Sequence, residues 1–295
     1  MPPRILQIFL IAIWTGTAAG VTFLVVQDNN SPSGYVNTVG NPLPTDAAPP
    51  EYQVMTRFER DNQYMDRGTS TYKQAFGVAL VNEPLTRVDK DFNLNPAAAT
   101  RWEVADDNLT WTYHIKEGLI FSDGHPLTAY DYEATFQRWA DPETGFDFEW
   151  YFRSIRNWAD VVAGRVPVDS VGVHALNDTT LVFITSRPTP YLPLLLNKSW
   201  VTPKHLFDKY GPEWATRPET HKASGPYRLL EWRKTDRIVL VPNDTYRGPE
   251  KPMLERVVVK LFNNAVTPQF LPAYEAGEVD YIPLENQAEI NRVKS

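Results

Sequence analysis

The chain has 295 residues, of which 42% are hydrophobic and 22% are charged, and its formal net charge is −7. This is the composition of an ordinary globular protein with room for more than one hydrophobic core. The acidic balance argues against nucleic acid as a partner, and the absence of cysteine excludes disulfides, thiolate metal sites and a cysteine nucleophile.

The first 51 residues are predicted to precede the folded part of the chain. No charged side chain occurs in residues 5–27, and about 20 apolar residues span a bilayer. Residues 17–19 fit a cleavage site, yet the apolar run continues beyond them, and cleaved signal peptides usually have a shorter one. Residues 1–27 are therefore either a signal peptide or a membrane anchor, and both alternatives export the rest of the chain. Residues 28–51, rich in Asn, Ser, Pro and Gly, are predicted to be a flexible linker.

Strand-like and helical runs then occur in mixed order. We expect strands over residues 53–58, 111–115, 168–175, 180–185, 227–232, 238–242 and 256–262. We expect helices over residues 70–81, 129–140, 191–196, 203–210 and 267–276. Gly277 stands at the C-cap of the last helix, although Pro272 lies inside it. Because strands and helices do not alternate strictly, the predicted fold class is α+β, with a mixed sheet.

The run from residue 101 to residue 142 carries the clearest local signals. Residues 106–108 form a polar turn, and the strand after it alternates in polarity, which is typical of a half-buried strand. One face of that strand would be formed by Trp111, Tyr113 and Ile115. Thr128 and Asp131 have the spacing of a capping box. The helix that they begin has one apolar face, formed by Tyr132, Phe136 and Trp139.

No catalytic or metal-binding constellation stands out. The five histidines lack the spacing of a helical metal motif. Asp106, Asp107 and Asp123 are candidates for the paired carboxylates of glycoside hydrolysis, but that reaction needs a set distance across a substrate, and turn chemistry already explains them. The turn at residues 225–227 is no phosphate loop, because no Gly-rich run with Lys and Ser or Thr comes after it.

Several of these stretches, in the same order, resemble the family-5 extracellular solute-binding proteins, the peptide-binding components of bacterial ABC importers. The resemblance rests on Trp102-Glu-Val, Asp106-Asp, Phe121-Ser-Asp-Gly, Pro126-Leu-Thr-Ala, Asp141-Pro, Val171-Gly-Val-His, Gly225-Pro-Tyr and Ala276-Gly-Glu-Val-Asp. It extends from about residue 52 to the C-terminus. Within the family, residues 155–165 look closest to the oligopeptide binders.

The resemblance implies a bilobal fold like that of the type II periplasmic binding proteins, with a small inserted domain. Residues 52–85 and 169–262 would form the first lobe, and residues 86–168 the inserted domain. Residues 263–295 would start the second lobe, which is largely missing because the chain ends well short of a normal member. We therefore expect the 295-residue chain to bind peptide weakly or not at all.

The resemblance also implies a function without chemistry. The protein would capture oligopeptides in the periplasm or on the outer face of the cell membrane and deliver them to an ABC permease, with no cofactor and no enzymatic step. Backbone groups would pair with the ligand as an added strand. The implied ligand-binding residues are Thr69, Ser70, Thr71, Tyr72, Phe146, Phe148, Gly225 and Tyr227.

Simpler interpretations of these residues stay open. Thr69–Tyr72 also fits the first turn of a helix, the aromatic cluster at 146–152 fits a core, and the Gly225 turn fits a plain connection into a strand. Two other functions also stay open. One is an exported hydrolase acting on glycans or peptides, for which the nine tryptophans would supply stacking surfaces. The other is the same fold binding a non-peptide solute such as a nickel chelate or a sugar.

Overall fold

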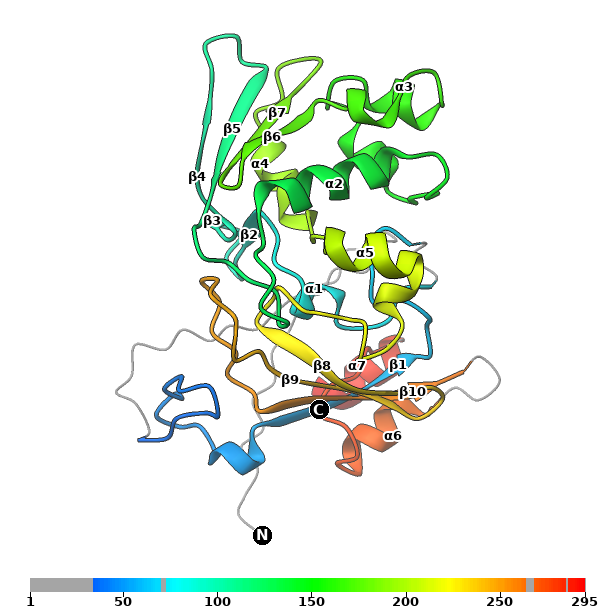
Figure 1. Cartoon of the computed structure of the whole chain (residues 1–295). Coiled ribbons are helices and arrows are strands. Elements are labelled where there is room, and N and C mark those ends of the chain that lie inside the picture. Colours follow the sequence, from blue (N-terminus) through cyan, green and yellow to red (C-terminus); the bar gives the residue numbers. More distant parts are fainter. Residues whose placement is uncertain (1–33, 70–72, 264–267, 285, 295) are drawn as a thin grey trace.

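The computed structural model describes residues 34–69, 73–263, 268–284 and 286–294 (Figure 1). Two four-stranded sheets lie one above the other in this view, each with its own hydrophobic core. Within the described ranges, no helix has both the length and the apolar character that a membrane crossing requires. Residues 1–27, the predicted signal peptide or anchor, lie outside the described residues.

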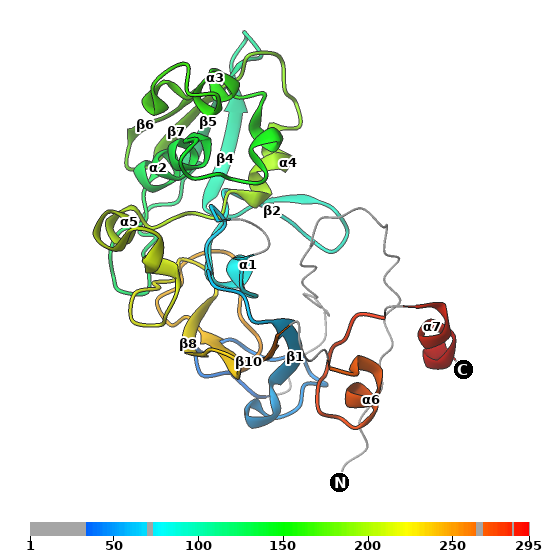
Figure 2. The same ribbon diagram turned by 90° about the vertical axis from the view of Figure 1, so that its right-hand side faces the viewer.

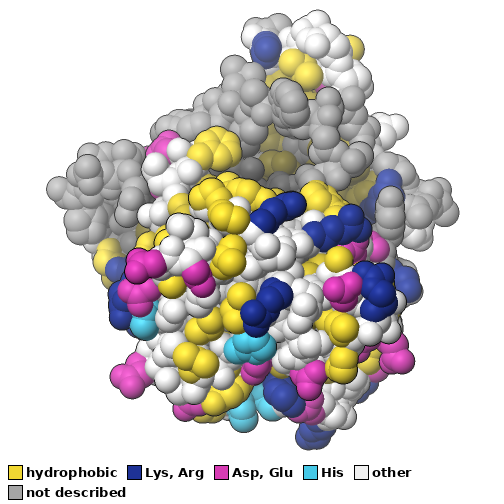
Figure 3. All heavy atoms as spheres, turned by 90° about the horizontal axis from the view of Figure 1, so that it is seen from above, with side chains coloured by type: hydrophobic (Ala, Val, Ile, Leu, Met, Phe, Trp, Pro, Cys, Tyr) yellow, Lys and Arg dark blue, Asp and Glu magenta, His cyan; other side chains and the backbone are white. Residues whose placement is uncertain are grey.

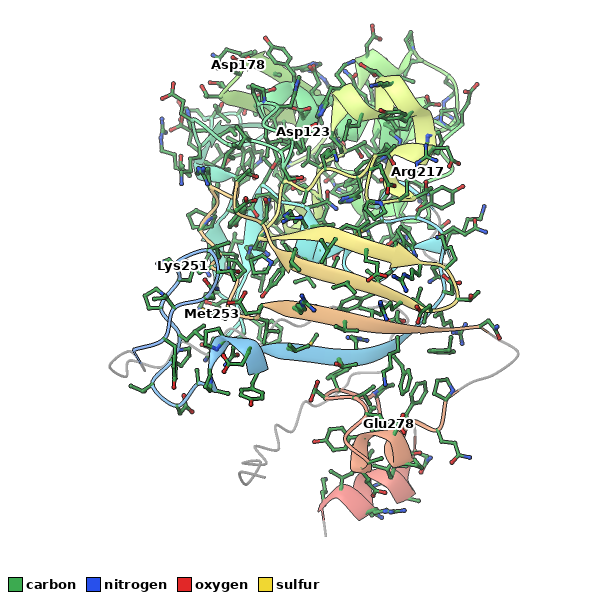
Figure 4. The ribbon with its side chains drawn as sticks, turned by 60° about the horizontal axis from the view of Figure 1, so that its bottom comes forward. Asp123, Asp178, Arg217, Lys251, Met253 and Glu278 are labelled. Carbon is green, nitrogen blue, oxygen red and sulfur yellow. The ribbon has the colours of Figure 1, made fainter. Side chains whose placement is uncertain are left out.

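The lower sheet is mixed, as the sequence predicts. Its strands follow the order β1-β10-β9-β8 and are shown side by side in Figure 4. β10 pairs in parallel with β1, whereas the β10–β9 and β9–β8 pairs are antiparallel. The strands are β1 (Val54–Arg60), β8 (Tyr227–Arg233), β9 (Arg237–Pro242) and β10 (Arg256–Phe262). Their apolar side chains pack with the short helix α1 (Val78–Val81) into one core.

The upper sheet is antiparallel, with the order β4-β5-β7-β6. Its strands are β4 (Ala99–Val104), β5 (Thr110–Ile115), β6 (Val173–Asn177) and β7 (Thr180–Ile184). Helix α2 (Ala129–Ala140) packs against β6 and β7, and α3 (Trp158–Val162) packs against α2. Rings from α2 and the strands meet edge to face, as in the contact of Phe136 with Phe183 at 5.0 Å between centroids. Such contacts stabilise an aromatic core beyond its buried area.

The local predictions for this sheet and helix are confirmed. Trp111, Tyr113 and Ile115 are buried on one face of β5. Helix α2 has the predicted bounds, and its capping box is formed: the Asp131 carboxylate accepts a hydrogen bond from the Thr128 backbone N–H at 2.9 Å. Each of these features is set by side chains within a few residues of one another, which explains why the sequence alone is enough to predict them.

The remaining elements are short. They are the hairpin of β2 (Thr86–Val88) and β3 (Leu94–Pro96), and the helices α4 (Leu192–Leu195), α5 (Lys204–Tyr210), α6 (Phe270–Glu275) and α7 (Gln287–Lys294). Short 3₁₀ turns also occur at Pro50–Tyr52, Glu149–Phe152, Val168–Ser170, Leu196–Lys198 and Gly211–Ala215. Figure 2 shows α6 beside β1 and α7 farther out.

Two predicted elements start later than expected. The helix predicted over residues 70–81 spans only Val78–Val81 where the structure describes it, because Gly77 precedes it with a φ of 104°, a value that no helical residue adopts. The strand predicted over residues 168–175 begins at Val173. Before it, Gly172 packs so closely that a Cβ atom there would lie 2.5 Å from the carbonyl oxygen of Ile184.

The predicted boundary between lobe and inserted domain at residue 168 needs correction. Strands β6 and β7 lie beyond that boundary, yet β7 pairs directly with β5 of the inserted domain, from Thr110 opposite Ile184 to His114 opposite Thr180. Leu192, Leu196 and Val201 also belong to the upper core. The residues that pack as one unit with the upper sheet therefore extend to about residue 201.

Residues 34–51, the described part of the predicted flexible linker, are packed against the folded part of the chain. Leu43 is buried, with an exposed fraction of 1%. The Asn37 side chain donates a hydrogen bond to the Pro252 carbonyl at 2.5 Å, and Thr38 bonds both carboxylate oxygens of Glu255. Figure 4 accordingly places this segment beside Lys251 and Met253. Its composition resembles a linker because it consists of turns, but those turns are docked on the loop before β10.

Candidate functional site

Asp66 fixes the start of the segment in which the sequence predicts ligand contacts. Its carboxylate is buried and receives two hydrogen bonds from the Arg138 guanidinium, at 2.7 and 3.1 Å, in a bidentate ion pair. It also accepts the Gly68 backbone N–H at 3.0 Å, and the Asp66 carbonyl accepts the Thr69 hydroxyl at 2.8 Å. The backbone that leads into residues 70–72 is therefore held against α2.

Arg67 points from this segment onto aromatic rings. Its Cζ atom lies 4.2 Å from the ring centroid of Phe148, 5.2 Å from that of Trp200 and 5.9 Å from that of Phe146. Burial lowers the pKa of Arg67 to about 10, while the neighbouring Tyr151 and Asp147 raise it. The segment around Thr69 is thus joined to the aromatic cluster of the inserted domain by a partly desolvated cation.

A groove of about 540 Å³ opens beside this segment. It lies between residues 68–69, α2 and α5, and its walls include Thr69, Arg138, Thr202, Lys204 and Phe207. The volume is in the range of small-molecule pockets, about 300–1,000 Å³. The ion pair of Asp66 with Arg138 therefore supports one wall of an open groove.

The structure sorts the predicted site residues into three groups. Ser70, Thr71 and Tyr72 lie outside the described residues. Thr69 lines the groove, and Phe148 is half-buried beneath Arg67, so these two remain ligand-contact predictions.

Phe146, Gly225 and Tyr227 lie in packing positions, and their ligand contacts stay a prediction. Tyr227 is buried in the lower core, and its hydroxyl accepts the Leu254 backbone N–H at 3.1 Å. Phe146 is buried and stacks on Trp139 at 4.9 Å. Gly225 lies so close to the C-terminal end of α1 that a Cβ atom would be 2.6 Å from the Leu80 carbonyl oxygen. An aromatic residue at a strand start suits a core as well as a cleft, and the sequence does not distinguish the two.

Two of the carboxylates considered for hydrolysis, those of Asp107 and Asp123, accept hydrogen bonds within turns. Hydrogen bonds from the backbone N–H groups of Leu109 and Thr110 hold the pKa of Asp107 below its usual range. Asp123, labelled in the upper part of Figure 4, lies 3.0 Å from Nε2 of His205. On the top face, acidic, basic and hydrophobic side chains are interspersed (Figure 3). Across the described part of the chain, no group of three or more His, Cys, Asp or Glu side chains is placed to hold a metal ion.

Glu83 joins the two cores. Its side chain is fully buried, and Oε2 accepts hydrogen bonds from Arg87 at 2.9 Å and from the Tyr246 hydroxyl at 3.0 Å. Its carbonyl accepts the hydroxyl of Tyr132 on α2, whereas its N–H donates to Ser224 beside the lower core. Burial raises the pKa of Glu83 well above its usual range, and Arg87 opposes that shift. This junction connects the upper and lower parts of the molecule.

His221 is predicted to make stability depend on pH. It is 3% exposed and stacks on Trp214, its ring nitrogens have no hydrogen-bond partner in the described chain, and burial lowers its pKa to about 4. The unfolded chain, with a pKa of about 6.5, binds this proton more readily, so stability is full above pH 6.5 and is lost as the pH falls towards 4. We expect protonation of His221 in the unfolded chain to lower the free energy of unfolding by about 2–3 kcal/mol between pH 7 and pH 4.5.

Urea denaturation of the parent and of His221→Phe at both pH values measures this contribution. Phenylalanine keeps the ring stack on Trp214 but takes up no proton, so the variant should lose less stability on acidification by that amount. Other groups titrate alike in both proteins and cancel in the difference. An equal loss in parent and variant would contradict the prediction.

Comparisons with known proteins agree with this architecture. Residues 93–295 match the bacterial extracellular solute-binding proteins, family 5 (middle part). The chain is 35% identical over 204 residues to the probable deoxycholate-binding periplasmic protein YgiS of Escherichia coli, covering 67% of this chain and 37% of that protein. It is also 35% identical over 202 residues to the periplasmic oligopeptide-binding protein OppA of Salmonella typhimurium, covering 67% and 36%.

A solved structure resembles the fold over a comparable share of the chain. The peptide-bound OppA of Listeria monocytogenes superimposes with a TM-score of 0.68 at 26% identity, covering 77% of this chain and 46% of that one. The chain thus spans less than half the length of these proteins. The predicted likeness to periplasmic peptide-binding proteins is confirmed at the level of the fold.

Proposed function

The chain belongs to the bacterial extracellular solute-binding proteins of family 5, and from this premise we propose that it captures oligopeptides outside the cytoplasm for an ABC importer. The similarity to oligopeptide-binding proteins in both sequence and fold supports this proposal most directly. Members of the family bind solutes, and we propose accordingly that this chain performs no reaction on its ligand. Its partners would be the peptide and the permease, and its location the periplasm or the outer face of the membrane.

The geometry around Asp66 suggests how a peptide would be held. The ion pair with Arg138 orients the backbone from Gly68 to Thr69, and that backbone continues into the residues predicted to add the ligand as a strand. Main-chain hydrogen bonds provide affinity that depends little on ligand sequence. A segment already fixed before binding loses less conformational entropy when the ligand arrives. Contacts from a second lobe would then close over the peptide.

Ligand-detected NMR tests this function, because it registers weak binding. We expect saturation transfer from the 295-residue chain to a pool of tri- to pentapeptides, with dissociation constants weaker than micromolar because the chain covers only part of its relatives. Maltotriose serves as the control solute and should show no transfer. Peptides recovered intact after prolonged incubation would support binding without hydrolysis. Cleavage that disappears in Asp123→Asn would support the hydrolase instead.

A non-peptide solute is the second candidate. One of the relatives matched at 35% identity is named a probable deoxycholate-binding protein, so peptide is not the only ligand class among the relatives. The same NMR experiment with deoxycholate below its micelle concentration distinguishes the two. Transfer to deoxycholate without transfer to any peptide would replace the peptide proposal.

A further inference from the structure

Two basic side chains face one indole ring near the segment after Asp66. Arg67 Cζ lies 5.2 Å and Lys198 Nζ 5.4 Å from the ring centroid of Trp200. They come from distant parts of the chain, because Arg67 precedes the predicted ligand segment whereas Lys198 ends the 3₁₀ turn Leu196–Lys198. Burial lowers the pKa of Lys198, and the positive charge of Arg67 lowers it further. The two cations thus lie near the same ring and are partly withdrawn from water.

Their hydrogen-bonding capacity is largely unused. Within the residues that the structure describes, neither cation forms an ion pair. Arg67 reaches only Gln74 Oε1, at a long 3.4 Å, and its Nε is buried without a partner. The neighbouring Tyr151 and the exposed Asp147 raise the pKa of Arg67, but neither forms an ion pair with it. A guanidinium has five N–H donors and an ammonium three, so most donors of this pair remain available to a ligand.

The surroundings favour an anion with an apolar stem. Two like charges held together away from water destabilise the protein unless a counter-charge joins them. The rings of Phe148 and Trp200 offset part of that cost through cation–π attraction. The half-buried ring of Phe148 also offers an apolar surface to methylene groups. A carboxylate that bridges both cations satisfies their donors and neutralises their repulsion.

We propose that Arg67 and Lys198 form a subsite for a carboxylate of the bound peptide, with the half-buried Phe148 ring as its apolar wall and the buried Trp200 ring beside both cations. This inference rests on the proposed function and adds a ligand preference to it: acidic peptides are favoured over neutral ones of the same size. The carboxylate has two candidate sources, an acidic side chain or the C-terminus of the peptide.

Three tetrapeptides separate these sources. Ala-Glu-Ala-Ala and Ala-Gln-Ala-Ala are prepared as C-terminal amides, and Ala-Gln-Ala-Ala also as the free acid. NMR titration of the 295-residue chain gives a dissociation constant for each. We expect a peptide that carries the right carboxylate to bind about tenfold more tightly than the amidated Gln peptide, the usual effect of a charged hydrogen bond. The preference should shrink at high salt.

Variants assign the preference to these residues. Arg67→Met and Lys198→Met keep the length of the side chain and remove the charge, and each should abolish the preference while circular dichroism shows a folded protein. Lys209→Met is the matched control, because Lys209 lies 4.9 Å from the ring centroid of its neighbour Tyr210, away from the subsite, and should leave the preference unchanged.

The outcomes divide cleanly between this inference and the function on which it rests. Equal binding of all three peptides, or a preference that survives both Met variants, overturns the subsite and leaves the proposed function intact. Binding of none of the peptides overturns the proposed function and the subsite together. Loss of the preference in both Met variants but not in Lys209→Met supports the subsite.

Discussion

Replacing Glu83 with alanine is expected to lower the free energy of unfolding by about 3–5 kcal/mol, the usual effect of breaking a buried ion pair. The variant removes the carboxylate that pairs with Arg87 at 2.9 Å and accepts the Tyr246 hydroxyl at 3.0 Å. Arg87 is left half-buried with only Glu250, 3.4 Å away, and Tyr246 loses its acceptor. Urea denaturation monitored by tryptophan fluorescence measures the change.

Two variants define what this loss means. Glu250→Gln removes the other acidic partner of Arg87, but its side chain is 28% exposed, so we expect a cost of no more than about 1 kcal/mol. Glu83→Gln keeps the shape of the side chain and should fall between the two. If Glu83→Ala loses less unfolding free energy than Glu250→Gln, the buried network contributes little to stability.

The Glu83 junction also has a consequence for function. Its partners come from the upper part through Tyr132 and from the lower part through Ser224. The upper part carries Phe148, whereas Trp200 packs in the lower core and Arg67 comes after the strand β1 of the lower sheet. A ligand that contacts both parts therefore depends on their relative position. Loosening the junction is expected to weaken peptide binding even at temperatures where the variant remains folded.

Features set by near neighbours were predictable from the sequence. Helix α2 has its predicted bounds because the cap, the apolar face and the terminal Asp141-Pro142 all lie within one short run. The residues of strand β5 alternate between half-buried and buried positions because one face of the strand packs in the core. Gly277 has the positive φ, 71°, that a helix C-cap requires. These signals need no knowledge of the rest of the fold.

Features set by distant partners were not predictable. Asp66 pairs with Arg138 across 72 positions, and Glu83 bonds Tyr246 across 163. Nothing in the local pattern around Asp66 indicates a buried carboxylate, because Asp followed by Arg and Gly is typical of an exposed turn. The same limit applies to Tyr227, whose place in the lower core depends on partners far away in the sequence. The order of the motifs along the sequence identified the family, whereas the groups that shape the candidate site depend on tertiary contacts.

Asp66→Ala is expected to have an effect on stability as large as that of Glu83→Ala, and a stronger effect on binding. It leaves the Arg138 guanidinium, only 10% exposed, without its carboxylate, which costs about 3–5 kcal/mol. It also removes the acceptor of the Gly68 N–H, so the backbone before Thr69 loses its anchor. We expect peptide binding to disappear at temperatures where the variant is still folded, because the segment must then be ordered at the expense of binding.

The reciprocal variant tests whether the ion pair is the anchor. Arg138→Met removes the other half of the pair and leaves Asp66 with the Gly68 N–H, so the double variant with Asp66→Ala should be less destabilised than the sum of the two single variants. Glu103→Ala breaks an exposed pair with Arg101 and should change neither stability nor binding measurably. Additive effects of the two single variants would mean that the ion pair is not the anchor. Unimpaired peptide binding in a folded Asp66→Ala protein would mean that the segment after Asp66 does not hold the ligand.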